Sequence, residues 1–179
     1  RDRSPSRGLG DVYKRQSHKL VRNAITGLAR MQHRGAILAD GKTGDGCGIS
    51  LQMPQQFFQT ISKEMGLPLP EHFAVGMVFF PQDKQKVTVL KNIIQQELEQ
   101  ETLPAIGWRE VPINKSVLGD IAASSLPWIQ QIFIAAPPGW KAKDVERRLF
   151  MARRRIEKKI NDKDFYICSL STQILIYKG

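Results

Sequence analysis

The sequence predicts an α+β fold in which mainly antiparallel strands are flanked by helices. Strand-like and helix-like segments intermix along the chain without the strict strand–helix–strand alternation of a parallel sheet. Several strand-like segments are also joined by short turns, which suit antiparallel neighbours because parallel strands need a long crossover. With 179 residues, the chain is long enough for one domain with a substantial core.

Four segments have apolar residues at the spacing of an amphipathic helix. The first has Ser17 as its predicted N-cap, and the second is expected to bury Phe58, Ile61 and Met65. The last begins near Asp144. The four predicted helices span Ser17–Gln32, Gln55–Met65, Lys84–Glu101 and Asp144–Ile160.

Six shorter segments are rich in apolar, β-branched and aromatic residues and predict strands. The run Phe73–Phe80 is almost wholly apolar, which favours a strand buried on both faces. The last two strands are expected to pair around Ser171 and Thr172, whereas residues 114–125 have no regular pattern. The predicted strands span Ile49–Met53, Phe73–Phe80, Gly107–Val111, Ile129–Ala135, Phe165–Leu170 and Gln173–Tyr177.

The composition predicts a soluble protein of a reducing compartment. No apolar run approaches the roughly 20 residues that span a bilayer, and the first residues do not form a secretory signal. The two cysteines, Cys47 and Cys168, are far apart and have no metal-ligand spacing, so we expect no metal site and a cytoplasmic location. Cys168 lies in an apolar strand and is expected to be part of the core.

Residues 1–16 differ in composition from the rest of the chain. They contain five basic and two acidic residues, which give +3 of the net charge of +10, and they have no hydrophobic period. Such a segment resembles translated adapter sequence, although a native disordered basic arm has the same composition. We therefore predict a tail at 1–16 and a single folded domain at 17–179.

The segment Met31–Gly48 contains five glycines between a helix and a strand. So many backbone-permissive positions indicate a loop whose path matters for function. Arg34 and Gly35 stand at its start, where an arginine can either orient a neighbouring polar segment through several donors or simply complement the helix dipole. The local pattern does not separate these two roles.

Three further residues in this loop are candidates for chemistry. Cys47 could act as a nucleophile activated by His33 or Arg34, but a small residue in a crowded glycine loop explains it more simply. Asp40 and Asp45 could act as paired carboxylates or metal ligands, yet aspartates beside glycines are typical of turns, and this interpretation is favoured.

The main basic feature is the run 146–159, Glu-Arg-Arg-Leu-Phe-Met-Ala-Arg-Arg-Arg-Ile-Glu-Lys-Lys. As an alternative function, a helix from Arg147 to Lys159 could grip nucleic acid phosphates. It could also contact an acidic neighbouring domain. Its apolar stripe is intact and acids are interspersed, which favours a solvated helix face and makes nucleic acid a poor candidate partner.

Several segments resemble the class II glutamine amidotransferase domain of the glutamate synthase large subunit. The loop sequences His33-Arg-Gly-Ala36 and Ala39-Asp-Gly-Lys-Thr-Gly-Asp-Gly-Cys-Gly48 resemble the start of that domain. Further resemblance runs through Gly107-Trp-Arg-Glu-Val-Pro112, the run 146–157 and Phe165-Tyr-Ile-Cys-Ser-Leu-Ser171. The likeness extends from about Ser17 to Gly179.

The resemblance implies an N-terminal-nucleophile hydrolase fold with stacked sheets between helices. It implies hydrolysis of glutamine to glutamate and ammonia by an N-terminal cysteine, and ammonia transfer to a synthase site that aminates 2-oxoglutarate. For the full enzyme it implies FMN, an iron–sulfur cluster and electrons from NAD(P)H through FAD or from ferredoxin, with no cofactor in the present segment. Expected partners are the other domains of the large subunit and a small subunit, with no membrane.

The sequence departs from the family pattern at both ends. The cysteine-initiated strand expected before Ser17 is absent, as are the later glutamine-binding and oxyanion segments of the family. The resemblance assigns nucleophile positioning to Arg34 and Gly35, and a supporting loop to Thr43, Gly44, Asp45 and Gly46. It does not match Cys47 to the nucleophile, so we expect a partial domain without glutaminase activity.

Overall fold

The computed structural model describes residues 17–31, 35–44, 46–67 and 69–178. All four predicted helices and all six predicted strands are present in it. The helical elements are α1 (His18–Arg30), α2 (Gln55–Glu64), α3 (Lys84–Gln100), the short 3-10 helix η2 (Lys115–Val117), α4 (Asp120–Ser124) and α5 (Ala142–Lys159). The strands are β1 (Gly48–Gln52), β2 (Phe73–Phe80), β3 (Ala105–Glu110), β4 (Trp128–Ala135), β5 (Tyr166–Ser171) and β6 (Ile174–Lys178).

The described strands form two separate sheets, and every pairing is antiparallel, as predicted. Four strands are ordered β3-β4-β2-β5, and the other two form the sheet β1-β6. The apolar strand β2 lies between β4 and β5 and is buried along almost its whole length, which confirms its predicted position. The fold is therefore α+β.

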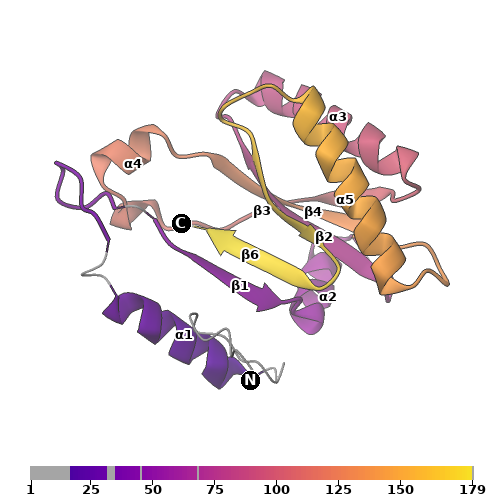
Figure 1. Ribbon diagram of the computed structural model, residues 1–179, viewed down its shortest axis with the longest axis horizontal. Coiled ribbons are helices and arrows are strands. Elements are labelled where there is room, and N and C mark those ends of the chain that lie inside the picture. The colour runs from indigo at the N-terminus through magenta and orange to yellow at the C-terminus, as the bar shows by residue number, and fades with distance from the viewer. Residues whose placement is uncertain (1–16, 32–34, 45, 68, 179) are drawn as a thin grey trace, which may run out of the picture.

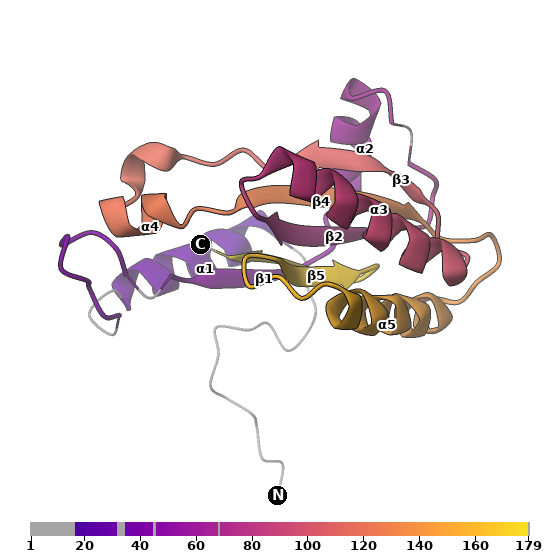
Figure 2. The same ribbon diagram turned by 90° about the horizontal axis from the view of Figure 1, so that it is seen from above.

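Two apolar cores divide the molecule into layers. One lies between the four-stranded sheet and the helices α3 and α5, and it contains the predicted stripes of both helices. The other joins the two sheets through side chains such as Met77, Phe133 and Leu175. Helix α1 lies beside β1, on the side of the molecule away from α3 and α5 (Figures 1 and 2). Helices thus flank two stacked sheets.

The expected pairing of the last two strands is wrong. β5 pairs with β2 in the larger sheet, whereas β6 pairs with β1 in the smaller one. The chain changes sheet at Ser171–Gln173, where the carboxylate of Glu146 on α5 accepts hydrogen bonds from the Ser171 hydroxyl at 3.0 Å and from Thr172 N at 2.6 Å. This contact, 25 and 26 residues distant in sequence, fixes the crossing in place of a hairpin.

Three helix details also differ from the prediction. In α2, Phe58 and Ser62 are buried while Met65, just after its end, is 41% exposed, so the buried face is rotated from the expected one. Helix α5 begins two residues before Asp144, and its N-cap, Lys141, makes no side-chain capping bond. Helix α4 lies within the segment that showed no regular pattern, because five residues are too few for a recognisable period.

Helix α1 confirms Ser17 as N-cap, since the serine Oγ accepts a hydrogen bond from Leu20 N at 3.2 Å. Its apolar stripe, however, is not buried by the described residues. Ile25 is 53% exposed and no residue of α1 is buried. The hydrophobic period thus predicts the helix correctly but does not show what covers it.

Candidate functional site

The glycine-rich loop after α1 folds back on itself as a short hairpin. Ile37 and Gly44 form an antiparallel bridge, and Leu38 N donates a hydrogen bond to Thr43 O at 2.8 Å. Near the tip, Gly41 has a φ of +68°, a conformation that residues with a side chain rarely adopt. Residues 37–44 of the predicted loop therefore form a defined hairpin, with its turn beside Asp40.

The carboxylate of Asp40 joins this hairpin to α4, which is distant in sequence. It accepts hydrogen bonds from Lys42 N at 3.1 Å, Thr43 N at 2.8 Å and the Thr43 hydroxyl. It also accepts one from Ile121 N at 3.2 Å, while Thr43 Oγ1 accepts one from Ala122 N at 3.2 Å. These bonds, the Thr43 hydroxyl first among them, hold the pKa of Asp40 far below its ordinary value. The ionised carboxylate is thus the form that binds both segments.

Gly119 allows this contact because it has no side chain. A β-carbon there would lie 2.7 Å from Thr43 N, and closer still to Asp40 Oδ2 and Thr43 Oγ1. Any other residue would push α4 away from the hairpin. We call the contact between Asp40, Thr43 and the start of α4 at 119–122 the loop clamp. It agrees with the predicted turn role of Asp40 and adds a long-range role that local sequence patterns do not show.

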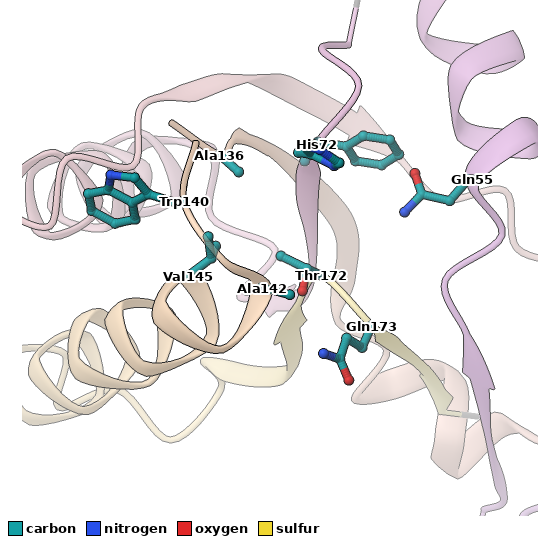
Figure 3. Close-up of a pocket in the computed structure, with 9 residues that line it drawn as sticks. Gln55, His72, Ala136, Trp140, Ala142, Val145, Thr172 and Gln173 are labelled. Carbon is teal, nitrogen blue, oxygen red and sulfur yellow. The ribbon is translucent and has the colours of Figure 1, made fainter. Parts of the chain in front are cut away.

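A cavity of about 230 Å³ lies at the other end of the β1-β6 sheet (Figure 3). Its polar lining includes Gln55, His72, Thr172 and Gln173, and Trp140 lies across from Gln55. None of the described residues predicted for the site lines it. Among the described residues, no cluster of three or more His, Cys, Asp or Glu side chains could hold a metal ion. The loop is therefore a separate feature from the cavity.

Comparison with known proteins identifies the family. The model of the family described as glutamine amidotransferases class-II matches residues 8–179. The chain belongs to the class-II glutamine amidotransferases. The two antiparallel sheets flanked by helices are consistent with the N-terminal-nucleophile hydrolase fold that the resemblance implies for this family.

Individual relatives of this amidotransferase chain are glutamate synthases. Ferredoxin-dependent glutamate synthase 2 of Synechocystis sp. is 38% identical over 173 residues, which cover 96% of this chain and 11% of the relative. The glutamate synthase [NADPH] large chain of Azospirillum brasilense is 41% identical over 167 residues, 89% of this chain and 11% of the relative. That of Bacillus subtilis is 37% identical over 168 residues, 92% of this chain and 11% of the relative. The chain thus spans about a tenth of these relatives.

Of the predicted site residues, Thr43 is part of the loop clamp and the others lie near it in sequence. Arg34 and Asp45 lie outside the described residues. Gly35 is exposed just before the hairpin, and Gly46 follows it with a φ of +77°. Thr43 is 7% exposed and is the clamp's central side chain, while Gly44 forms the bridge to Ile37.

Sequence reasoning missed the α4 half of the clamp. Gly119, Ile121 and Ala122 belong to the segment for which no element was predicted. A glycine followed directly by Asp120 is typical of a helix N-terminus and was the available signal. Nothing local, however, connects that start to a loop some 80 residues earlier.

The two cysteines have different environments. Cys168 is buried in β5, as predicted, and burial raises the pKa of its thiol to about 11. Cys47 is exposed, and no side chain among the described residues forms a hydrogen bond with its sulfur. Burial makes Cys168 a poor nucleophile, because a reactive thiol needs a base, a cation or a helix N-terminus close by and access to its substrate. His33 and Arg34, the residues that could activate Cys47, lie outside the described residues.

The basic run on α5 is mostly engaged in ion pairs within the protein. Its cations pair with acids of α3 and α5: Arg147 with Asp144, Arg148 with Glu101, Arg153 and Arg154 with Glu157, Arg155 with Glu97 and Glu101, and Lys159 with Glu97. Of the seven basic residues between 147 and 159, only Lys158 has no such pair among the described residues. The helix therefore serves the packing of α5 on α3, which favours the structural interpretation over nucleic acid binding.

No helix in the described part of the chain has the length and apolar content needed to cross a membrane.

Proposed function

We propose that the chain forms part of the ammonia-producing domain of a glutamate synthase. In this role the domain hydrolyses glutamine to glutamate and ammonia, and the ammonia serves the reductive amination of 2-oxoglutarate elsewhere in the protein. The observation that carries the proposal is the similarity to glutamate synthases along nearly the whole chain, combined with membership of the amidotransferase family.

Within this function, Arg34 and Gly35 position the nucleophile, and Thr43, Gly44, Asp45 and Gly46 form the supporting loop. The loop clamp supports this assignment. Asp40 and Thr43 hold the hairpin that follows Gly35 against α4. The hydrogen bonds therefore restrict the backbone of this hairpin. A rigid support suits a site in which a reacting group must be held within a fraction of an ångström.

The chain by itself, we propose, does not hydrolyse glutamine. Its two cysteines are a buried thiol in β5 and an exposed thiol without an activating partner among the described residues. Ammonia release from glutamine by the 179-residue chain should equal the buffer blank, before and after Cys47→Ala. Ammonia release that disappears in the Cys47→Ala variant would restore Cys47 as nucleophile.

The gene that encodes this segment provides the test of the function itself. We expect its reading frame to supply a cysteine-initiated strand before Ser17 and a synthase part after Gly179. The protein encoded by the complete gene should form glutamate from glutamine and 2-oxoglutarate. If the protein encoded by the complete gene had no glutamine-dependent activity, the proposed function would be excluded.

The protein encoded by the complete gene also tests the role of the supporting loop. Thr43→Val removes the hydroxyl that joins Asp40 and Ala122 while keeping the side-chain shape. We expect the glutamine-dependent kcat to fall while the activity with added ammonia is unchanged. The matched control is Thr60→Val, because Thr60 is exposed on α2 and its hydroxyl donates a local hydrogen bond to Gln56 O. Equal effects of the two variants, or loss of both activities, would remove the loop's assigned role.

The cofactors and location of the full protein are also proposals. Relatives are named as ferredoxin-dependent and as NADPH enzymes, which supports a flavin and iron–sulfur electron path without selecting the donor. A separate small subunit is proposed only for an NADPH-type enzyme. Both cysteines are free, which supports a reducing compartment, and we propose the cytoplasm.

A further inference from the structure

The side chain of Lys91 on α3 ends among three aromatic rings. Its Nζ lies 4.9 Å from the ring centroid of Trp108, 5.8 Å from that of Trp128 and 5.9 Å from that of Phe80. All three distances fall within the roughly 6 Å at which a cation is attracted by the face of an aromatic ring. Three rings around one ammonium group make an aromatic cage.

The three rings of the cage come from neighbouring strands of the four-stranded sheet. Phe80 ends β2, Trp128 begins β4 directly opposite it, and Trp108 lies in β3. The Phe80 ring is fully buried and meets the Trp108 ring edge to face, with centroids 5.4 Å apart. Phe80 thus belongs to the packed core between the sheet and α3, and Trp108 and Trp128 pack against that core.

The rings, and not an ion pair, are the contacts of this ammonium group. No carboxylate among the described residues lies within 4.0 Å of Lys91 Nζ, although Glu110 at the end of β3 acts on it electrostatically. Burial lowers the pKa of Lys91, and Glu110 opposes that shift. A half-buried cation without a salt bridge needs another source of stabilisation, and the ring faces supply it.

We propose that Phe80, Trp108 and Trp128 form a binding site for alkylammonium cations, in which Lys91 is the resident ligand. The site takes ammonium and methylated ammonium groups, because both keep their positive charge against the rings. It does not take an acylated lysine, which is neutral. The site lies on the α3 side of the larger sheet and is independent of the glycine loop and its proposed function.

Emptying the cage tests this directly. In a Trp140→Phe background, Trp108 and Trp128 are the only tryptophans, so tryptophan fluorescence, excited selectively over the tyrosines, reports on the cage. Lys91→Ala in that background should show a saturable fluorescence change with tetramethylammonium chloride, with a Kd in the millimolar range. The matching chain that retains Lys91 should show none, because its site is filled.

Two probes separate cation binding from other effects. The neutral isostere 3,3-dimethylbutan-1-ol, whose tert-butyl group has the shape of a trimethylammonium group, should give no saturable change, and sodium chloride at equal ionic strength should give none. An equal response to the neutral isostere would show a merely apolar hole and overturn the proposal. A lack of saturation with tetramethylammonium, or the same response in the Lys91-containing chain, would overturn it as well.

A second set of variants covers the case in which Lys91→Ala does not fold. Lys91→Arg keeps a cation that stacks on the rings, whereas Lys91→Gln keeps a polar chain without charge. We expect Lys91→Arg to melt within about 1 °C of the parent and Lys91→Gln about 2–6 °C lower. Lys84→Gln, at an exposed position of the same helix, is the control and should not change the Tm. Equal Tm values for the Arg and Gln variants would contradict a cation site.

Discussion

The carboxylate of Asp40 accepts a hydrogen bond from the backbone N–H of Ile121 at 3.2 Å, across 81 residues of sequence. The same carboxylate closes the turn of its own loop through Thr43 N. One side chain therefore caps a local turn and the start of a distant helix. Because Oδ1 accepts from Thr43 N while Oδ2 accepts from Ile121 N, the arrangement depends on a side chain with two acceptor oxygens at this position.

Replacing Asp40 should loosen α4 specifically. In Asp40→Ala, we expect the amides of Ile121 and Ala122 to exchange with deuterium about tenfold faster. Ile121 N loses its acceptor, and Thr43 Oγ1, the acceptor of Ala122 N, loses the carboxylate to which it is hydrogen-bonded. Asp83→Ala is the matched control, since Asp83 caps α3 through Gln85 N and Lys86 N and forms no hydrogen bond to a distant segment among the described residues. Exchange at Ile121 that is equally fast in both variants would mean that the clamp does not hold α4.

Gly119→Ala should weaken the same contact from the other side. An added β-carbon would overlap the Asp40 carboxylate and the Thr43 hydroxyl, so we expect a loss of about 1–3 kcal/mol in the free energy of unfolding. Urea titration measures this loss. In the Asp40→Ala/Gly119→Ala double variant, the combined loss should be smaller than the sum of the single losses, because both changes break one contact. Strict additivity would show that the two residues act separately.

Local sequence patterns predict the helices and strands of this fold better than they predict how the strands pair. The stripe of Val87, Leu90, Ile94 and Leu98 predicts the buried face of α3, and all four side chains are in the core. The last two strands have the right extent but the wrong partner, because Glu146 redirects the chain between two sheets. Hydrophobic period determines which residues are buried, whereas sheet membership depends on side chains that are distant in sequence.

The candidate site shows the same division. The glycines of the loop and the turn role of Asp40 were evident from composition, because turn residues act on their own backbone. The contact with Gly119 could not be predicted from the sequence, because it joins two distant segments and neither local pattern indicates the other as its partner. The identification of Arg34 and Gly35 depends on family resemblance alone and is still a prediction.

The buried carboxylate of Glu97 should be essential for packing α5 on α3. It is 0% exposed and pairs with Arg155 Nε at 2.6 Å and with Lys159. Glu97→Ala leaves both cations without their acid, and we expect a loss of about 2 kcal/mol in unfolding free energy, reduced from the fully buried case because Arg155 and Lys159 are partly exposed. Glu99→Ala, two residues along the same helix and exposed, should cost much less. Similar urea midpoints for the two variants would contradict this role.

The same carboxylate should make the fold sensitive to acid. The hydrogen bond from Lys159, followed by that from Arg155, lowers the pKa of Glu97 below its ordinary 4.5. A depressed carboxyl pKa contributes stability that is fully present above about pH 4.5 and is lost as the pH falls towards the folded-state pKa. The Tm of the parent chain should therefore fall more steeply below pH 4.5 than that of Glu97→Gln. Parallel Tm curves for the two chains would exclude Glu97 as a source of acid sensitivity.

Thiol chemistry should distinguish the two cysteines of the folded chain. At pH 8, an aromatic disulfide reagent should label Cys47 quickly, because it is exposed, and Cys168 slowly, because burial blocks access and raises its pKa to about 11. Cys47→Ala should abolish the fast phase and leave one thiol that reacts only on unfolding in urea. A fast phase that persists in Cys47→Ala would place Cys168 in contact with solvent. It would then contradict the packing of β5 between the two cores, in which Cys168 belongs to the core that joins the two sheets.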